Sequence, residues 1–271
     1  MHRNILIEQI RNKKSFLCVG LDTDENKLPA HLIGTPDAMV HFNKAIIDAT
    51  KDYCVCYKIN TAFYEALGAK GWEIMEETVN YIPPTHLKIA DAKRGDIGNT
   101  SSYYAKAFFE TLAFDAITVA PYMGEDSIRP FLEYENKWTI VLGLTSNKGA
   151  ADFELLNLSA PYHTERLYER VLHTVSQWGN HYNLMFVTGA TQASELAAIR
   201  KIVPDHFLLV PGVGFQGGSL QEVATHGLNK DIGLLVNVSR GIIFAGKGED
   251  FAHEAGKIAE QYQAEMSGFV G

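Results

Sequence analysis

The chain alternates between short hydrophobic runs and longer stretches in which hydrophobic and polar positions recur with a helical period. The short runs are rich in Val, Ile, Leu and Phe, as is typical of strands buried on both faces of a parallel sheet. They predict eight strands, at residues 16–21, 53–59, 86–92, 116–120, 138–144, 184–187, 207–211 and 233–238. The amphipathic stretches predict a helix after each strand, at residues 38–50, 62–81, 100–114, 127–134, 164–178, 193–203, 219–226 and 251–266.

Eight strand–helix units in succession are the sequence form of an α/β protein with a (β/α)8 TIM barrel. A doubly wound open sheet would show the same alternation, so the pattern alone leaves that architecture open. A chain of 271 residues with 46% hydrophobic residues can fill one barrel. No linker, repeat or low-complexity segment interrupts it, so we expect a single domain over residues 1–271.

The charge of the chain argues against several classes of partner. A net charge of -8 and a pI near 5.7 do not suit a general binder of nucleic acid or anionic membranes, since both need clustered positive charge. The N-terminal residues lack the apolar core of a signal peptide, and no stretch approaches the roughly 18 apolar residues of a membrane span. We therefore expect a cytoplasmic protein without a membrane partner.

The cysteines and histidines predict neither disulfides nor a metal site. Cys18, Cys54 and Cys56 all fall in predicted strands, and an odd count in a cytoplasmic chain favours buried thiols. The C-x-C spacing is tighter than the usual zinc motif and lacks a second pair. The ten histidines are scattered, so we expect no metal.

The most informative charges lie where the third predicted strand meets its loop, in Asp91-x-Lys93-x-x-Asp96. Side chains two apart on a strand share a face, so Asp91 and Lys93 are expected to project together, with Asp96 just beyond. The free energy needed to desolvate such an array of charges is rarely recovered by folding alone. This favours a functional site over a solvated turn with a helix cap. Lys58, in an apolar run of the second strand, needs a carboxylate partner, and Asp91 on the neighbouring strand is the nearest candidate.

Other polar residues also follow predicted strands, and in a barrel all these ends meet at one mouth, where active sites lie. Asp22 follows the first strand and Ser146 the fifth, although Asp22 could instead cap a turn. Asp96 and Thr100 could likewise be no more than helix-start residues. The polar connection that begins at Thr145 is long enough to form a lid.

The loops after the seventh and eighth strands predict a phosphate pocket. Residues 211–219 contain four glycines, which let backbone N–H groups approach an anion. Arg240 follows the eighth strand, and its guanidinium suits bidentate contact with a phosphate. A tight turn and a solvated arginine are the alternatives, but the two loops together favour a phosphomonoester site.

These motifs resemble those of the orotidine 5'-phosphate decarboxylase family, and their residues are similar to those of its longer bacterial subgroup. The similarity covers most of the chain. The matching elements are Leu21-Asp22, Lys58, Asp91-x-Lys93-x-x-Asp96-Ile97-x-x-Thr100, Pro211-Gly212-Val213-Gly214-x-Gln216-Gly217-Gly218 and Ser239-Arg240-Gly241.

The resemblance implies a cofactor-independent decarboxylase of pyrimidine biosynthesis that converts orotidine 5'-phosphate to uridine 5'-phosphate and CO2. It implies a homodimer with shared sites, in which the tetrad Lys58, Asp91, Lys93 and Asp96 lies under the substrate and Asp96 comes from the partner subunit. The resemblance assigns the remaining contacts as follows: Asp22 and Lys58 to the ribose, Ile97 and Thr100 of the partner to site closure, Ser146 to the pyrimidine, and Gly212, Gln216 and Arg240, flanked by Pro211 and Ser239, to the phosphate.

Two other functions compete with this one. A metal-dependent 3-keto-hexulose-phosphate decarboxylase or aldolase of related barrels would need an extra carboxylate ligand near the second strand, where this chain has Lys58. A non-catalytic nucleotide-binding barrel would need the phosphate loops but has no use for the lysine–aspartate array.

Overall fold

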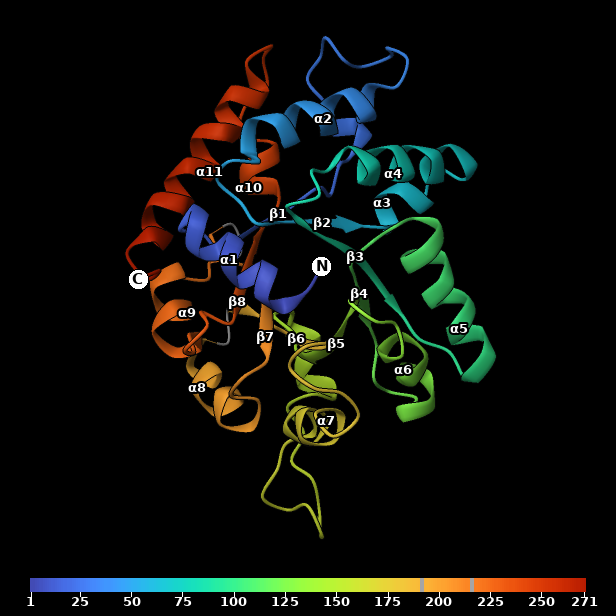
Figure 1. Cartoon of the computed structure of the whole chain (residues 1–271), viewed down its shortest axis with the longest axis vertical. Helices are drawn as coiled ribbons and strands as arrows, with labels where there is room; N and C mark the ends of the chain where they lie inside the picture. The colour runs from blue at the N-terminus through green and yellow to red at the C-terminus, as the bar shows by residue number, and fades with distance from the viewer. Residues whose placement is uncertain (191–192, 215–216) are drawn as a thin grey trace.

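The computed structural model describes residues 1–190, 193–214 and 217–271, and these form a closed barrel of eight parallel strands. Each strand pairs with the next along the chain, and the first pairs with the last through Leu17↔Val236 and Val19↔Val238. Figure 1 shows the strands in the middle of the molecule with helices around them. The (β/α)8 prediction is confirmed, and closure excludes the open-sheet alternative.

All eight predicted strands are present among the described residues. They are β1 Leu17–Gly20, β2 Cys56–Asn60, β3 Leu87–Arg94, β4 Ala116–Val119, β5 Trp138–Leu144, β6 Leu184–Thr188, β7 Phe207–Pro211 and β8 Leu234–Val238. The predicted bounds of β5 and β7 are confirmed, whereas β3 runs two residues further than predicted and so includes Lys93.

The predicted helices are also present, with differences at their ends. The α-helices are α1 Arg3–Lys13, α2 Ala38–Thr50, α3 Ala62–Glu65, α4 Ala69–Tyr81, α5 Gly98–Lys106, α6 Glu125–Leu132, α7 Leu167–Val175, α8 Ala193–Ile202, α9 Leu220–Gly227, α10 Arg240–Ile243 and α11 Phe251–Ser267. The single helix predicted at 62–81 is two helices, because Gly68 turns the chain with a φ of 63°. The helix predicted at 100–114 changes after α5 into a π-helical segment, η2 (Ala107–Thr111).

Helix α1 was not predicted, and it covers the amino-terminal end of the barrel. Its buried residues include Leu6, Ile7 and Ile10, which lie on one face. The Arg3 guanidinium donates to the carbonyl of His181 and forms an ion pair with Asp231, both of which lie before barrel strands. Figure 1 shows α1 crossing in front of the strands, so the open mouth of the barrel is at the opposite end.

The three cysteines are buried and free, which confirms the prediction of core thiols. Burial raises the pKa of the Cys54 thiol to about 12, so this thiol stays protonated at neutral pH. Within the described part of the chain, no helix is both long and apolar enough to span a membrane.

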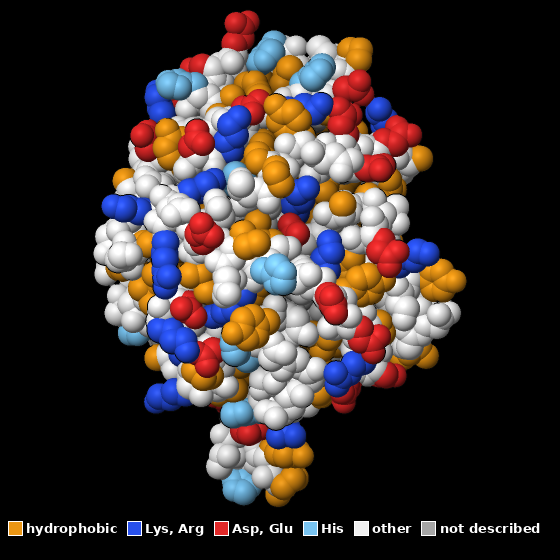
Figure 2. Space-filling model, viewed as in Figure 1, with side chains coloured by type: hydrophobic (Ala, Val, Ile, Leu, Met, Phe, Trp, Pro, Cys, Tyr) orange, Lys and Arg blue, Asp and Glu red, His pale blue; other side chains and the backbone are white. Residues whose placement is uncertain are grey.

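The connection after β5 is the long segment for which a lid was predicted. It contains a short 3₁₀ helix, η3 (Lys148–Asp152), and an antiparallel bridge between Asn157 and Arg166. Figure 1 shows the chain before α7 projecting beyond the lower edge of the barrel, and Figure 2 shows a protrusion in the same place. Movement of this segment as a lid stays a prediction.

Candidate active site

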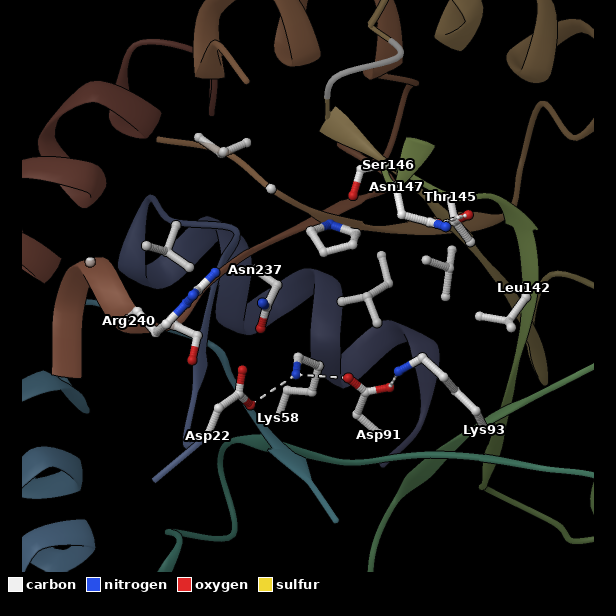
Figure 3. A pocket seen from close by; sticks show the side chains of 18 residues that line it. Asp22, Lys58, Asp91, Lys93, Leu142, Thr145, Ser146, Asn147, Asn237 and Arg240 are labelled. Carbon is white, nitrogen blue, oxygen red and sulfur yellow. Dashed lines mark hydrogen bonds and ion pairs between the residues drawn. The ribbon is translucent and has the colours of Figure 1, made fainter. Parts of the chain in front are cut away.

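A cavity of about 280 Å³ opens at the carboxyl ends of the strands. Its lining comes from elements far apart in the sequence, since it includes the ends of β2, β3, β5, β7 and β8 and the loops that follow β1, β5 and β7. This is the end of a (β/α)8 barrel at which active sites lie. Figure 3 shows the charged side chains of one wall gathered along one side of the cavity.

Four of these side chains form a row of alternating charge (Figure 3). The Lys58 ammonium lies 3.2 Å from Asp22 Oδ1 and 2.9 Å from Asp91 Oδ2. The other oxygen of Asp91 lies 2.5 Å from Lys93 Nζ. The predicted Lys58–Asp91 pair is therefore confirmed. Asp22 also pairs with Lys58, while Asp24 caps the next turn by accepting from the N–H of Asn26.

The ion pairs keep the inner members of this row charged. Burial alone would lower the pKa of Lys58, but the nearby carboxylates of Asp22 and Asp91 outweigh it and hold that pKa well above the usual lysine range. Burial would likewise raise the pKa of Asp91, but Lys58 and Lys93 outweigh it and hold that pKa well below its usual range. Lys93, at the outer end, has a half-exposed side chain that can meet a ligand.

An irregularity in β3 brings Asp91 and Lys93 to the cavity. Ala90 pairs with Ile117 and Arg94 pairs with Val119, so three residues of β3 face only one residue of β4. Lys93 lies within this bulge with a φ of 49°, in the left-handed region that residues other than glycine rarely adopt. Bulges commonly redirect side chains beside active sites, and this one leaves Lys93 Nζ in contact with Asp91 at the mouth.

The loop after β5 supplies uncharged polar groups to the wall opposite the ionic row. Thr145, Ser146 and Asn147 all line the cavity. Glu154 holds the first of them, because its carboxylate accepts from the Thr145 N–H at 2.7 Å and from the Thr145 hydroxyl at 2.8 Å. Gly189 lets the Ser146 backbone approach β6 closely, since a Cβ at residue 189 would lie 2.6 Å from the Ser146 nitrogen.

The loops after β7 and β8 form the remaining wall. Gly212 and Gly214 have φ values of 100° and 75°, so the β7 loop folds through conformations that favour glycine. The Ser239 hydroxyl donates to the carbonyl of Gly20 at 3.1 Å and joins the β8 loop to β1. Arg240 opens α10, and Figure 3 shows its side chain extending toward the cavity.

The structure brings together most of the residues proposed from the sequence. The cavity is lined by Asp22, Lys58, Asp91, Lys93, Ser146, Pro211, Gly212, Ser239 and Arg240. Gln216 lies outside the described residues. The described lining does not include Asp96, Ile97 or Thr100 of the same chain. Asp96 instead accepts from the N–H of Ile97, a local contact at the start of α5, and the Ile97 side chain is 61% exposed.

Several site residues were missed by the sequence analysis. Thr145, Asn147 and Asn237 line the cavity, while Glu154 and the β4 residue Thr118 bond to groups that line it. Asn237 had a detectable signal, because it is a polar residue in the apolar run of β8. Thr118 had none, since threonine is common in strands. Among the described residues, no three His, Cys, Asp or Glu side chains group as a metal ion would require.

The fold and the cavity together define a (β/α)8 enzyme with an ionic site at the carboxyl mouth of its strands. The chain belongs to the orotidine 5'-phosphate decarboxylase / HUMPS family, whose model matches residues 15–255. The resemblance inferred from the motifs is therefore confirmed.

Relatives named for this activity match nearly the whole chain. An orotidine 5'-phosphate decarboxylase of Flavobacterium johnsoniae is 61% identical over 268 residues, which are 98% of this chain and 97% of the relative. A structure described as a putative orotidine-monophosphate decarboxylase from Toxoplasma gondii superposes with a TM-score of 0.86 at 34% identity, covering 98% of this chain and 97% of that one. The UMP synthase of Leishmania donovani superposes with a TM-score of 0.83 at 38% identity, and the match covers 96% of this chain but only 56% of that longer one.

Proposed function

We propose that this chain removes CO2 from orotidine 5'-phosphate and so produces uridine 5'-phosphate for pyrimidine biosynthesis. The family match and the near full-length similarity to decarboxylases support the activity. The observation that carries the mechanism is the row Asp22–Lys58–Asp91–Lys93 along one wall of the cavity. The buried free cysteines also suit the reducing cytoplasm, which we propose as the compartment.

Lys93 is the proposed catalytic acid. When the bond from C6 to the carboxylate breaks, CO2 leaves and its bonding electron pair stays on C6 of the pyrimidine. No adjacent carbonyl delocalises that pair, so a cation already in place must stabilise it. The Lys93 ammonium would then donate a proton to C6 and regain one from solvent.

Asp91 and Lys58 are the proposed support for this step. Asp91 contacts both ammonium groups, so it fixes Lys93 while Lys58 balances its charge. Because the Lys58–Asp91 pair is part of the folded chain, its cost of organisation falls on folding and not on the reaction. Lys58 and Asp22 are further proposed to contact the ribose.

The loops after β7 and β8 are the proposed phosphate site. Gly212, Arg240 and the neighbouring Pro211 and Ser239 line the part of the cavity beside β7 and β8, and we assign Ser146, in the loop after β5, to the pyrimidine. We extend this assignment to Gln216. Binding energy from a phosphate held here could be used to close the segment after β5 over the substrate.

We propose that the active unit is a homodimer in which Asp96, Ile97 and Thr100 complete the partner's site. Their absence from the described cavity lining and the exposure of Ile97 support this arrangement. A mixing experiment with Lys93→Ala and Asp96→Ala chains tests it. Each parent homodimer has two damaged sites, whereas a mixed dimer has one site with both lesions and one intact site. When equal amounts reassort at random, about half of the dimers are mixed and each has one intact site of two, so roughly one quarter of wild-type activity should return. No recovery after verified subunit exchange would contradict the shared site.

The activity itself is tested by adding orotidine 5'-phosphate to protein treated exhaustively with EDTA. Loss of the substrate's ultraviolet absorbance, with uridine 5'-phosphate as the product, is the expected result. Activity that disappears with EDTA and returns with a divalent metal would favour the metal-dependent alternative. The structure argues against that alternative, because the Lys58 ammonium lies between the two carboxylates that a cation would need.

A further inference from the structure

Thr118, in the middle of β4, faces the bulge of β3 and lies in contact with two proposed catalytic groups. Thr118 is 1% exposed, so its hydroxyl has no access to bulk water. That oxygen accepts the backbone N–H of Lys93 at 2.9 Å. The same hydroxyl donates its hydrogen to Asp91 Oδ1 at 3.1 Å.

The hydroxyl replaces a bond that the bulge removes. In a regular parallel ladder, the N–H groups of one strand bond to carbonyl groups of its neighbour. Between the Ala90↔Ile117 and Arg94↔Val119 pairs the register shifts, and the Lys93 N–H bonds to the Thr118 side chain instead. Because Lys93 also has a left-handed φ of 49°, a specific partner is needed to keep its backbone in that conformation.

The second bond of the hydroxyl orients the Asp91 carboxylate. Asp91 Oδ1 receives both the Thr118 hydroxyl and Lys93 Nζ, while Oδ2 receives Lys58 Nζ. A rotation of this carboxylate would exchange or lengthen its contacts with the two ammonium groups. Thr118 therefore touches the backbone of one reacting residue and the side chain of the group that orients it.

We propose that Thr118 is a positioning residue that sets the geometry between Asp91 and Lys93. This inference rests on the proposed function, in which Lys93 acts on the substrate. A hydroxyl is required and a methyl group is not, so serine should serve in place of threonine and valine should not, although valine has nearly the same shape.

The test compares Thr118→Val with Thr118→Ser and with a matched control on the neighbouring strand. Thr139, on β5, is also fully buried, but no described residue bonds to its hydroxyl. Thr139→Val therefore makes the same chemical change without removing a hydrogen bond. Each variant is assayed for kcat and KM with orotidine 5'-phosphate, for thermal unfolding, and for amide hydrogen exchange in residues 91–95.

Thr118→Val should lower kcat by about tenfold to a hundredfold, since small misplacements of reacting groups have effects of that size. Its KM should stay within about threefold, because the phosphate site is untouched. Exchange in residues 91–95 should accelerate, and Thr118→Ser and Thr139→Val should behave like the wild type. Full kcat and unchanged exchange in Thr118→Val would overturn the proposal, as would equal losses in the serine or control variants. A wild-type protein without decarboxylase activity would refute the proposed function, while the exchange experiment would still decide whether Thr118 holds the bulge.

Discussion

Replacing Lys58 with methionine tests whether the ionic row stabilises the fold as well as the reaction. Methionine keeps most of the length of the side chain but has no charge. Lys58 is 3% exposed, and the side chains of its partners Asp22 and Asp91 are 17% and 11% exposed. Removing the cation would leave two poorly solvated carboxylates facing each other, so we expect the Lys58→Met protein to be less stable and inactive.

The size of the effect follows from this burial. Removing one partner of a buried ion pair typically costs about 3 to 5 kcal/mol, and the partial exposure of both aspartates points to the lower end of that range. In a chain of this size, each kcal/mol lowers Tm by roughly 2 to 4 °C. A loss of about 3 kcal/mol therefore corresponds to a fall of roughly 6 to 12 °C near neutral pH.

The loss should shrink as the pH falls. In the wild type, the depressed pKa of Asp91 contributes stability above its unfolded pKa of about 4, and this is lost only as the pH falls through the lower folded value. Without Lys58, Lys93 alone opposes the effect of burial, so the folded pKa of Asp91 is higher than in the wild type, and a protonated Asp91 needs no cation. The raised pKa of Lys58 keeps it charged in the wild type throughout this range.

Thermal unfolding measured from about pH 3 to pH 8 checks this prediction, since the range must extend below the unfolded pKa of Asp91. Lys44→Met is the matched control, since Lys44 forms a more exposed pair with Glu77 at 2.6 Å. That surface pair should contribute less than about 1 kcal/mol. A Lys58→Met protein no less stable than the control, or a difference that grows toward low pH, would refute the reasoning.

Three further predictions concern activity. Lys93→Ala should abolish turnover with Tm nearly unchanged, because its side chain is half exposed, and a near-normal kcat would remove Lys93 from the mechanism. Arg240→Ala should raise KM strongly and lower kcat if phosphate binding drives closure; equal turnover of phosphate-free orotidine by the wild type would disprove the phosphate site. Glu154→Gln keeps one acceptor for Thr145 and so weakens the hold on a residue that lines the cavity, which should raise KM about three- to tenfold. An unchanged KM in steady-state assays would show that Glu154 does not position Thr145 for substrate binding.

Much of the fold could be predicted because hydrophobic periodicity decides it locally. The run of β7 is uniformly apolar and that of β5 is apolar except for Thr139 and Gly143, and both end at polar or glycine-rich residues, so their bounds were predicted correctly. Helix α1 was missed although Leu6, Ile7 and Ile10 have helical spacing. The break at Gly68 depends on one residue with a positive φ, and a hydrophobic pattern that continues on both sides does not show it.

Some residues of the candidate site could likewise be predicted from the sequence, and others could not. Charged residues in apolar surroundings, such as Lys58 and Asp91, can be found from the sequence because burying them is costly. The bulge cannot, since it results from pairing between β3 and β4 and not from either run alone. Thr118 is functional only through that bulge, and Glu154 only through the way the chain folds back onto Thr145.

The pairing of β1 with β8 has a consequence for synthesis of the protein on the ribosome. Val19 pairs with Val238, so the barrel cannot close until more than two hundred further residues have been translated. At about 5 to 20 residues per second, β1 waits roughly 10 to 45 seconds for this partner. During that time one edge of β1 has unsatisfied backbone groups, and nascent chains shorter than about 240 residues should be the species most prone to aggregate or to recruit chaperones.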